Sequence, residues 1–574
     1  MTHLINDPRQ FPAESLRGMV AANRTYMQPV HGGVVRTTTS PHGEVSVVVG
    51  GGSGHYPAFA GWVGPGMAHG AVCGNIFASP SASQVESVVR AADNGGGCLL
   101  LFGNYAGDVL HFGMARDALV ASGLDTRIVT VSDDVASNTV EHHDDRRGIA
   151  GDLFVVKAAC AAAAAGRDLD AVEAAARRAN EASRSLGVAF TGCTLPGAAE
   201  PLFTVPDGTY ALGLGIHGEP GISSHEMTTA HEIAELLVDR LLAEEPVRGG
   251  GYTGRVAVLL NGLGATKYEE LFVLYASVSR LLEARGLSIV APVVGEQVTS
   301  LDMAGASLSL MFLDEDLEAL WLAAADSPAF KTGALPADAH ARARVVAAET
   351  STVLTAGSPD SARQAAVAAT LLDVMAATAV AEEAELGRLD SIAGDGDHGQ
   401  GMVLGATAAA RAAHEALDAG VGMATLFSQA GAAWAEGAGG TSGAAWGKAI
   451  TTFGEALSDQ EAADDDALIR AGAAAARAFE TVGTARPGDK TMVDATRPFA
   501  DELAAHAASG AALATAWREA ATTATAHAER TADLVARKGR ARTHGEASLG
   551  HPDPGAVSFA LLMKAVADHL AARD

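Results

Sequence analysis

The sequence has few of the features that mark secreted, membrane-bound or nucleic-acid-binding proteins. Its 574 residues include four scattered cysteines and no C-x-x-C pair, which is too few for a disulfide scaffold. Lys and Arg number 40 against 68 Asp and Glu, and the net charge of −28 argues against nucleic acid or an anionic membrane surface as a partner. The first residues, MTHLINDPRQF, lack an apolar secretory segment, and apolar stretches elsewhere are interrupted by charges. We therefore expect a soluble cytoplasmic protein without a membrane span.

Aromatic residues are also scarce, at 5%, whereas glycine is abundant, with 65 residues that need an explanation in loops. Hydrophobic residues make up 48% and charged residues 19%, so the chain can bury a sizeable interior. The chain is too long for one ordinary core. Its length predicts about three packing units, or fewer if one is a large α/β domain.

The first part of the chain alternates short apolar strands with helices, the pattern of an α/β domain. Helices are expected over 81–94 and 153–165. Residues 331–362 hold turn residues at both ends and predict a linker with room for a helix in its middle. We therefore expect an α/β domain over residues 1–330. Its strands are expected over 45–50, 98–103, 127–131, 210–215 and 256–260.

Alanine-rich segments dominate the remainder, and alanine is the best helix former. Runs of β-branched residues are almost absent there, so residues 363–574 are expected to form an all-α domain. Its helices are expected over 367–385, 402–417, 424–435, 467–481, 497–509, 513–537 and 556–572.

In the first part, a glycine-rich segment follows one predicted strand and an aspartate follows another. Residues 50–55 (GGGSGH) let backbone N–H groups approach a small polar ligand, and a tight turn before a helix is the alternative. His55, at the end of this segment, is either catalytic or a structural histidine. Asp108 follows the strand 98–103 at a position where ligands bind in open sheets, although a helix N-cap is an equally good interpretation.

Residues 213–218 (GLGIHG) match the pattern G-x-G-x-x-G, but not its usual setting. Residues 219–221 (EPG) follow where a dinucleotide site needs a helix, and no strand ending in an acid comes next, so we reject a Rossmann site. The glycines place His217 on a loop, where a neutral imidazole could attack the carbonyl of a ketone or aldehyde. A loop histidine without a ligand is the simpler alternative from this motif alone.

The strongest local signal in the second part is an acidic loop. Asp390, Asp395 and Asp397 lie within eight residues, and like charges this close repel one another unless a cation lies among them. Hard oxygen ligands suit Mg²⁺, which in proteins usually also binds phosphates. A Ca²⁺ loop is disfavoured because the EF-hand spacing and its terminal Glu are absent. A solvated acidic loop is disfavoured because apolar residues and glycine separate the acids.

Three further compact segments join helices in the second part. Residues 437–443 (GAGGTSG) offer backbone donors, hydroxyls and a helix N-terminus, which together form an anion site; a flexible loop is the alternative. Residues 486–492 (RPGDKTM) and 550–555 (GHPDPG) are the other two. Loops at one end of a helix bundle can converge, so these segments and the acidic loop together predict a site for a Mg-nucleotide.

These motifs together resemble the single-chain, ATP-dependent dihydroxyacetone kinase family over nearly the whole chain. The first part resembles its substrate-binding K domain, and the second resembles its nucleotide-binding L domain, which the resemblance implies to be a helical barrel. Nine motifs in the family's order carry the resemblance: GGGSGH, FASPS (77–81), NYAGD (104–108), CTLPG (193–197), GIHGEPG (215–221), GDGDHG (394–399), GGTSGA (439–444), RPGDKTM and GHPDPGA (550–556).

The resemblance implies roles for the matched residues of the first part. His217 would form a covalent hemiaminal with the substrate ketone, which selects ketoses over glycerol. His55 and Asp108 would polarise the hydroxyl that attacks the γ-phosphate of ATP. The substrate would be lined by Gly52, Ser53, Gly54, His55 and Asp108.

For the second part, the resemblance implies ATP as the phosphoryl donor and Mg²⁺ as the cofactor. Asp390, Asp395 and Asp397 would hold Mg²⁺ on the phosphates of ATP. Fusion of both domains in one chain favours ATP over a phosphoenolpyruvate-dependent relay, and a homodimer is expected. The nucleotide would be contacted by Asp395, Gly396, Asp397, His398, Thr441, Ser442, Gly483, Thr491, Met492, Asp553, Pro554 and Gly555.

The sequence departs from the family pattern around the substrate loops, where several changes remove charge. Tyr56 and Phe59 stand where Glu and His commonly follow the loop histidine, and Asn75 replaces an aspartate. Gly103 replaces a lysine. Loss of this lysine makes room for another carbon, so four-carbon erythrulose, as either enantiomer, is a candidate substrate beside dihydroxyacetone.

One departure lies in the second domain, where Ala547 replaces an expected arginine. We hypothesise that Arg542 or Arg540 supplies that charge to the phosphates. The leading hypothesis is therefore a Mg-ATP-dependent kinase that phosphorylates a terminal hydroxyl of a short ketose. A non-catalytic ketose sensor that kept the fold and a side activity that cleaves FAD as a cyclase are the alternatives.

Overall fold

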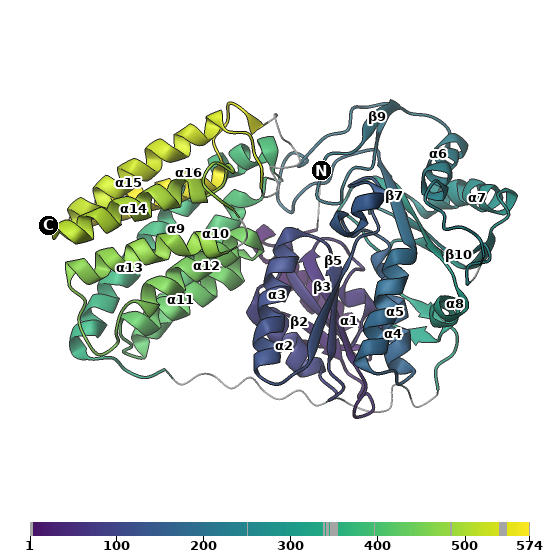
Figure 1. Cartoon of the computed structure of the whole chain (residues 1–574), viewed down its shortest axis with the longest axis horizontal. Coiled ribbons are helices and arrows are strands. Elements are labelled where there is room, and N and C mark those ends of the chain that lie inside the picture. Colours follow the sequence, from purple (N-terminus) through teal and green to yellow (C-terminus); the bar gives the residue numbers. More distant parts are fainter. Residues whose placement is uncertain are drawn as a thin grey trace. The chain divides into compact units, whose positions relative to one another are not determined.

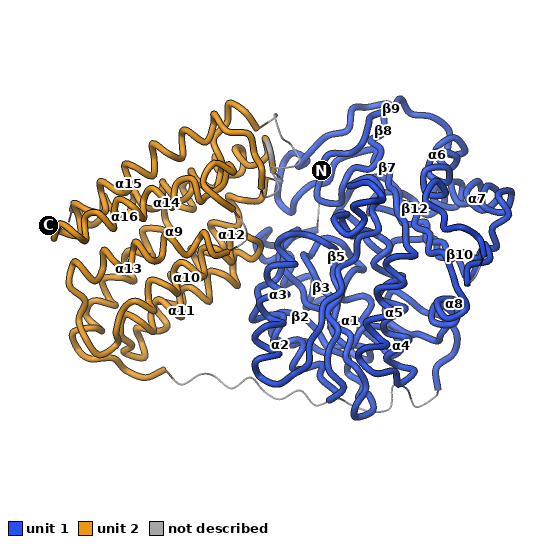
Figure 2. The backbone as a smooth tube through the Cα atoms, viewed as in Figure 1, with its two compact units in different colours: residues 1–348 blue, residues 349–574 orange. Residues whose placement is uncertain are grey.

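The computed structural model describes residues 4–249, 251–336, 339, 344, 354–394, 396–482, 485–538 and 548–572. The chain divides into two compact units, residues 1–348 and 349–574, which Figure 2 shows in blue and orange. The first unit is an α/β structure and the second consists of helices, as predicted. The predicted linker, 331–362, overlaps β14 (Lys331–Thr332) and the start of α9 (Pro359–Ala393), and most of its middle lies outside the described residues.

The first sheet of unit 1 has the strand order β1-β2-β4-β3-β5-β6. β3, β4, β5 and β6 run parallel, so their carboxyl ends meet at one edge, whereas β1 and β2 are antiparallel additions. Runs of apolar residues in β3 and β5 suit a sheet that is covered on both faces. The strands are β1 (Met27–Val30), β2 (Gly33–Arg36), β3 (Ser46–Ser53), β4 (Gly70–Ile76), β5 (Cys98–Gly103) and β6 (Thr126–Val131).

The second sheet of unit 1 has the strand order β11-β10-β12-β7-β8-β9. Only β10 and β11 pair in parallel among its described strands, and the other neighbours are antiparallel. A two-stranded ribbon pairs β13 (Ala325–Asp326) with β14. The strands of the second sheet are β7 (Ser183–Ala189), β8 (Thr209–Leu212), β9 (Ser223–Glu226), β10 (Arg255–Gly262), β11 (Ser288–Gly295) and β12 (Gly305–Phe312).

Helices separate the two sheets and cover their outer faces (Figure 1). α4 (Asp152–Ala164) packs between the sheets and is buried along almost its whole length. α2 (Ala82–Ala92) and α3 (Ala106–Ala121) cover the other face of the first sheet. α6 (Ala230–Leu242) and α7 (Tyr268–Ala284) cover the outer face of the second sheet. The remaining helices of the unit are α1 (Phe11–Ala22), α5 (Leu169–Ala182) and α8 (Glu315–Leu322).

The described residues of the second unit form a closed barrel of eight α-helices. Each helix packs against the next along the chain, and α16 packs against α9 to close the ring. Successive helices run antiparallel, and the longer connections α13–α14 and α15–α16 also return the chain to the end where the preceding helix stops, as the bond from the Asp553 backbone N–H to Thr531 shows for α15–α16. The connections α9–α10, α11–α12, α13–α14 and α15–α16 therefore lie at the same end of the barrel. After α9 the helices are α10 (His398–Asp418), α11 (Met423–Ala438), α12 (Gly440–Glu455), α13 (Asp465–Ala478), α14 (Val493–Ser509), α15 (Leu513–Arg530) and α16 (Pro554–Ala571).

Large aromatic side chains gather inside the barrel, although the chain has few of them. Trp434 and Trp446 stack with their ring centroids 4.9 Å apart, and the ring centroid of Phe559 lies 5.7 Å from that of Trp446.

By length and composition alone, α9 could cross a membrane over Pro359–Ile392. This differs from the expectation that the chain has no membrane span. In the structure, one face of α9 contributes Ala365, Ala369 and Leu372 to the barrel core.

Candidate active site

The predicted glycine loop of the first unit is in fact the end of a strand. β3 continues through Ser53, so the expectation that the strand stops at residue 50 is wrong. A Cβ added at Gly52 would lie 2.8 Å from the backbone nitrogen of Ala78, so glycine is needed for close packing of this strand against the segment that follows β4. Gly52, Ser53 and Gly54 also line a cavity of about 340 Å³, and the Ser53 hydroxyl donates to the carbonyl of Gly74 at 2.6 Å.

His55 lies two residues after the end of this strand and is buried. Its Nδ1 donates to the carbonyl of Thr299 at 2.7 Å, and its ring stacks on Phe77 with the centroids 5.0 Å apart. Burial, followed by the charge of His217, lowers the pKa of His55 to about 3. His55 is therefore neutral near physiological pH, with its proton on Nδ1 and a lone pair on Nε2.

His217 lies on the turn between β8 and β9 and contacts His55 directly. The strand ends at Leu212, so the predicted strand over 210–215 is too long, and Gly213, at φ = 73°, starts the turn. The Nε2 atoms of His217 and His55 are 3.0 Å apart. The ring of Tyr105 packs edge-on against His217 with a centroid separation of 4.8 Å. The structure thus brings two of the three predicted catalytic residues into contact.

Glu219 holds the other nitrogen of His217 and was not among the predicted site residues. Its Oε1 lies 3.1 Å from Nδ1 of His217, and its Oε2 accepts from the His217 backbone N–H at 3.0 Å. The guanidinium of Arg147 lies 3.8 Å from Oε2 and forms an ion pair with Asp134 at 2.7 Å. The sequence did contain a signal for Glu219, because it lies two residues after His217 in the same motif. Arg147 and Asp134 had none.

Asp108 lies in the first turn of α3, at the carboxyl end of β5, and is buried. The alternative reading of Asp108 as a helix N-cap is wrong, because α3 begins at Ala106 and Tyr105 occupies the N-cap position. A second buried acid, Asp152, lies close enough for the two charges to interact. Burial, then the charges of Asp133 and Asp108, hold the pKa of Asp152 well above its usual range.

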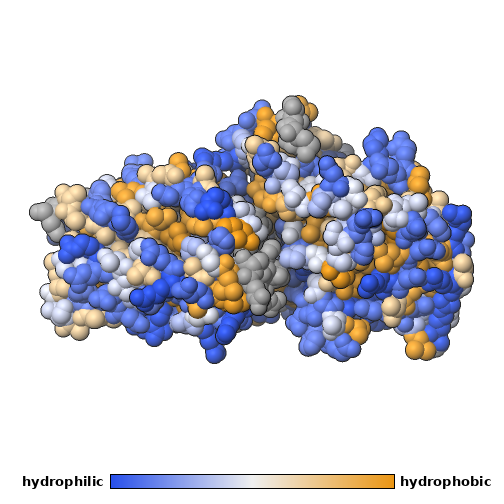
Figure 3. All heavy atoms as spheres, turned by 90° about the horizontal axis from the view of Figure 1, so that it is seen from above, coloured by the Kyte–Doolittle hydropathy of each residue, from blue (hydrophilic) through white to orange (hydrophobic). Residues whose placement is uncertain are grey.

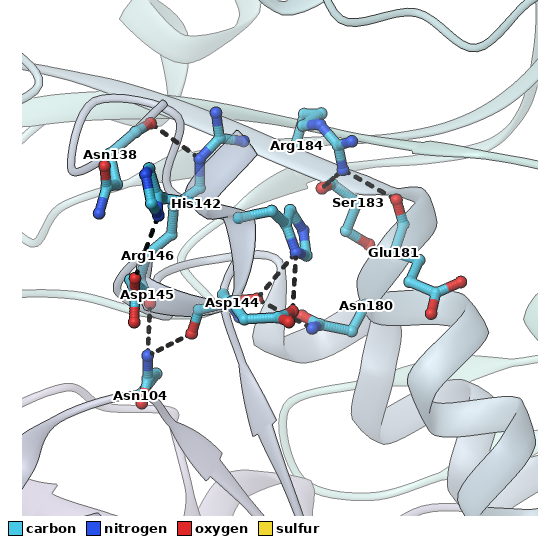
Figure 4. Close-up of polar contacts among 12 residues, drawn as sticks. Asn104, Asn138, His142, Asp144, Asp145, Arg146, Asn180, Glu181, Ser183 and Arg184 are labelled. Carbon is cyan, nitrogen blue, oxygen red and sulfur yellow. Dashed lines mark hydrogen bonds and ion pairs between the residues drawn. The ribbon is translucent and has the colours of Figure 1, made fainter. Parts of the chain in front are cut away.

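Asn104 anchors the backbone that carries Tyr105. Its side-chain amide donates to the carbonyls of Asp144 at 3.0 Å and Arg146 at 2.9 Å, as Figure 4 shows. Arg146 is fully buried and binds both carboxylate oxygens of Glu244, at 2.7 and 2.8 Å. The carboxyl end of β5 is therefore tied to the segment that follows β6, and the position of Tyr105 is fixed.

Gly103, which departs from the family pattern, lies beside the Tyr105 ring. A Cβ added at Gly103 would lie 3.1 Å from Cε2 of Tyr105 and 3.3 Å from the carbonyl of Gly148. Tyr105 also donates a hydrogen bond to that carbonyl at 3.0 Å. A side chain at position 103 would therefore crowd a ring that packs against His217.

Those predicted metal and nucleotide residues of the second unit that the structure describes lie at the four helix connections that share one end of the barrel. Asp390 is in the last turns of α9, and Asp397 immediately precedes α10. Thr491 and Met492 precede α14, and residues 553–555 open α16. Asp395 and Gly483 lie outside the described residues, as do Arg540, Arg542 and Ala547.

The acids at this end lie close together. Burial, then the charge of Asp390, raises the pKa of Asp397 above its usual range. The pKa of Asp553 is raised to about 7 by burial, with the charges of Asp494 and Asp390 adding to the shift. Oxygen donors that repel one another in this way fit a divalent cation such as Mg²⁺.

At the same end, side chains link α10 to α9 and α16 and hold the starts of α14 and α16. His398 exchanges a hydrogen bond with Ser558 at 2.9 Å, and its backbone N–H donates to Asp390 at 3.3 Å. The Thr491 backbone N–H donates to Asp494 at 2.8 Å, and Asp553 caps α16 by accepting from Ala556 at 2.7 Å. Two predicted site residues, His398 and Asp553, therefore also hold the helix ends in place.

The predicted glycine loop over 437–443 is wrong as a loop. α11 continues to Ala438 and α12 begins at Gly440, so only Gly439, with φ = 62°, separates the two helices. Thr441 and Ser442 lie in the first turn of α12. Their hydroxyls and the backbone N–H groups of that turn are the donors that suit an anion.

Comparisons with known proteins cover both units. Residues 17–329 match the Dak1 domain and residues 392–568 match the DAK2 domain. The L-erythrulose 1-kinase of Mycolicibacterium smegmatis is 55% identical, over 99% of this chain and 100% of that protein. The D-erythrulose kinase of the same organism is 51% identical, over 99% of this chain and 98% of that protein. The crystal structure of the dihydroxyacetone kinase from C. freundii in complex with AMP-PNP and Mg²⁺ has 30% sequence identity and a TM-score of 0.53, and the alignment covers 99% of each chain.

The order of the domains, the full-length identity and the solved structure agree with one another. The chain therefore belongs to the dihydroxyacetone kinase family, with its Dak1 and DAK2 domains in a single chain, and it is a kinase that phosphorylates a hydroxyl group of a ketose.

Proposed function

We propose that this protein phosphorylates a terminal hydroxyl of the four-carbon ketose erythrulose, with ATP as donor and the ketose held covalently on His217. The observation that carries the proposal is the pairing of Nδ1 of His217 with Glu219, because it leaves Nε2 as the nitrogen that would attack a carbonyl carbon. Attack of Nε2 on a ketone carbon gives a hemiaminal. Glycerol has no carbonyl group and cannot form this bond, so the covalent step accounts for selection of ketoses.

Two lines of support favour a four-carbon substrate. The relatives at 55% and 51% identity are named as erythrulose kinases. Gly103 carries no side chain beside Tyr105, and Tyr105 borders His217. Dihydroxyacetone, which is one carbon shorter, would fit the same site less closely.

Phosphoryl transfer would depend on position and charge more than on covalent chemistry. Asp108 and His55 would orient the reacting hydroxyl and take up its proton, because both lie at the carboxyl end of the first sheet. Asp390 and Asp397 would hold Mg²⁺, which would offset the charge of the ATP phosphates. The donors of the first turn of α12, including Thr441 and Ser442, would bind phosphate oxygens.

The test is a coupled ADP-release assay on the wild-type protein and His217→Ala. The compounds assayed with the wild-type protein would be both enantiomers of erythrulose, dihydroxyacetone and glycerol. We expect kcat/KM to be highest for one enantiomer of erythrulose. We expect His217→Ala to lose about 100-fold or more of kcat/KM for the ketoses and little for glycerol, because only the ketoses use the covalent bond.

Two results would contradict the proposal. If His217→Ala kept the wild-type ratio of ketose to glycerol activity, the covalent role of His217 would be wrong. If dihydroxyacetone had a higher kcat/KM than both enantiomers of erythrulose, the four-carbon substrate would be wrong.

A further inference from the structure

We propose that Glu219 is a positioning residue that holds the His217 imidazole with its proton on Nδ1 and balances the positive charge of the ring when Nε2 is bonded to a ketose carbon. This inference rests on the proposed covalent role of His217. It adds the means by which an ordinary loop histidine is oriented and kept nucleophilic at one defined nitrogen.

The geometry of Glu219 fixes both the ring and the backbone of His217. One carboxylate oxygen lies 3.1 Å from Nδ1, and the other accepts from the His217 backbone N–H at 3.0 Å. An ionised carboxylate only accepts hydrogen bonds, so Nδ1 must carry a proton. The ring is therefore held in one orientation, with Nε2 directed at His55.

The surroundings keep Glu219 ionised and in place. Burial alone would raise the pKa of Glu219, but the charge and hydrogen bonds of His217, together with the charge of Arg147, outweigh it and hold the pKa well below its usual range. Arg147 is in turn held by Asp134 and by the carbonyl of Gly213, at 3.3 Å.

The turn leaves space for this carboxylate only because of one glycine. A Cβ added at Gly215 would lie 2.0 Å from Oε2 of Glu219. The Gly215 backbone N–H also donates to the Glu219 carbonyl at 2.9 Å, which closes the turn around His217. Gly215 and Glu219 of this motif therefore both determine the orientation of His217.

The contact with His55 accounts for the proton that must leave Nε2. His55 donates from Nδ1 to Thr299, so its Nε2 bears a lone pair that faces Nε2 of His217 at 3.0 Å. Two facing lone pairs would repel, so a proton lies between them. In the resting site this proton is on His217, whose positive charge is paired with Glu219.

The addition step then balances without an outside acid or base. The Nε2 proton of His217 passes to Nε2 of His55, and the freed lone pair bonds to the ketone carbon. The C=O π electrons move to the oxygen, which takes the proton from His55. The ring remains cationic, now through its N–C bond, and Glu219 opposes the same charge before and after the step.

The experiment compares wild type with Glu219→Gln, with [2-¹³C]dihydroxyacetone as the probe. On the wild-type protein, we expect the ¹³C resonance of C2 to move from the carbonyl region to that of a tetrahedral carbon. On Glu219→Gln, we expect an adduct dissociation constant at least about tenfold higher and a kcat/KM for ketoses about 100-fold lower, with the KM for ATP unchanged. Glu245→Gln is the matched control, because Glu245 is also a partly buried, ion-paired glutamate, and we expect wild-type values for it.

A second measurement does not depend on the folding of a variant. ¹⁵N-labelled histidine in the wild-type protein, with the His217 signal assigned by its absence in His217→Ala, reports which ring nitrogen is protonated. Protonated Nδ1 supports the proposal, and a neutral ring protonated only on Nε2 overturns it. A Glu219→Gln protein that forms the adduct as tightly as wild type also overturns it, whereas absence of any adduct on wild type overturns the proposed function together with this inference.

Discussion

Burial keeps a second histidine of the first unit neutral, away from the active site. His69 is completely buried, and its Nδ1 accepts from the Val47 backbone N–H at 3.1 Å. Its Nε2 donates to Glu44 at 3.0 Å. Burial, then the charge of Arg36, lowers the pKa of His69 to about 4. A proton on Nδ1 would break the bond to Val47, so the folded state resists protonation that the unfolded chain accepts.

This difference predicts that acid weakens the first unit. In the unfolded chain His69 has a pKa near 6.5, so unfolding takes up a proton, and stability falls as pH drops below that value until the folded-state pKa of about 4 is reached. Between about pH 7.5 and about pH 5, His69 should account for a loss of about 2 kcal/mol. Local unfolding free energies of β3 and β4 from hydrogen exchange at the two pH values would measure it.

His69→Gln is the control for this prediction, because glutamine does not titrate. We expect the variant to be less stable than wild type at the higher pH, since one buried hydrogen bond is lost. Its stability should change with pH by about 2 kcal/mol less than that of wild type. Equal pH dependence in the two proteins would show that His69 does not take up the proton.

Glycines inside helices set the distances between elements of the barrel. Where α11 crosses α12, a Cβ added at Gly431 would lie 2.8 Å from the carbonyl oxygen of Gly447 and 2.8 Å from the backbone nitrogen of Thr451. Neither backbone atom can move aside as a side chain could. In contrast, a Cβ added at Gly401, inside α10, meets nothing within 4 Å.

The two glycines predict opposite effects of the same substitution. Gly431→Ala should lower the free energy of unfolding of the barrel by about 1–3 kcal/mol, because α11 and α12 must separate. Gly401→Ala should raise it by about 0.5–1 kcal/mol, because alanine loses less conformational freedom in a helix. Urea denaturation of the full chain, followed through the second-unit tryptophans, would compare them, and a stabilising Gly431→Ala would show that the crossing is not tightly packed.

The sequence pattern located elements better than it located their ends. The strand over 98–103 is predicted to the residue, because an apolar run bounded by glycines is buried on both sides. The helix predicted over 513–537 ends at Arg530, since alanine-rich composition continues past the point where the chain leaves the helix. The glycines at 437–443 suggested a loop, but most of them pack inside α11 and α12.

The site was predicted only where its residues lie within motifs. His55 and His217 were found in this way, and the structure places them in contact. Thr299, which fixes the tautomer of His55, is 244 residues away in the sequence and lies in no recognised motif. Contacts of this kind depend on the packing of the two sheets, which local sequence does not encode.

At the scale of the whole molecule, the predicted ketose residues all belong to the first unit and the predicted nucleotide residues to the second. The negative charge is not confined to either unit, because Asp and Glu outnumber Lys and Arg both in residues 1–348 and in residues 349–574. Hydrophilic residues cover much of the face of both units in Figure 3, with small apolar patches among them. A surface of this composition favours solubility, and the proposed binding of anionic ATP would therefore depend on local donors and on Mg²⁺.

This separation predicts that each ligand protects its own unit from hydrogen exchange. A saturating ketose should slow exchange in residues 213–221 and 52–56, and AMP-PNP with Mg²⁺ should slow it in 396–401, 490–494 and 551–556. At about 100 times its dissociation constant, each ligand should stabilise its unit by about 2.7 kcal/mol. His217→Ala should lose the protection by ketose and keep that by the nucleotide, because the nucleotide residues lie on other elements. Protection of the barrel connections by ketose alone would instead mean that the second unit takes part in binding the sugar.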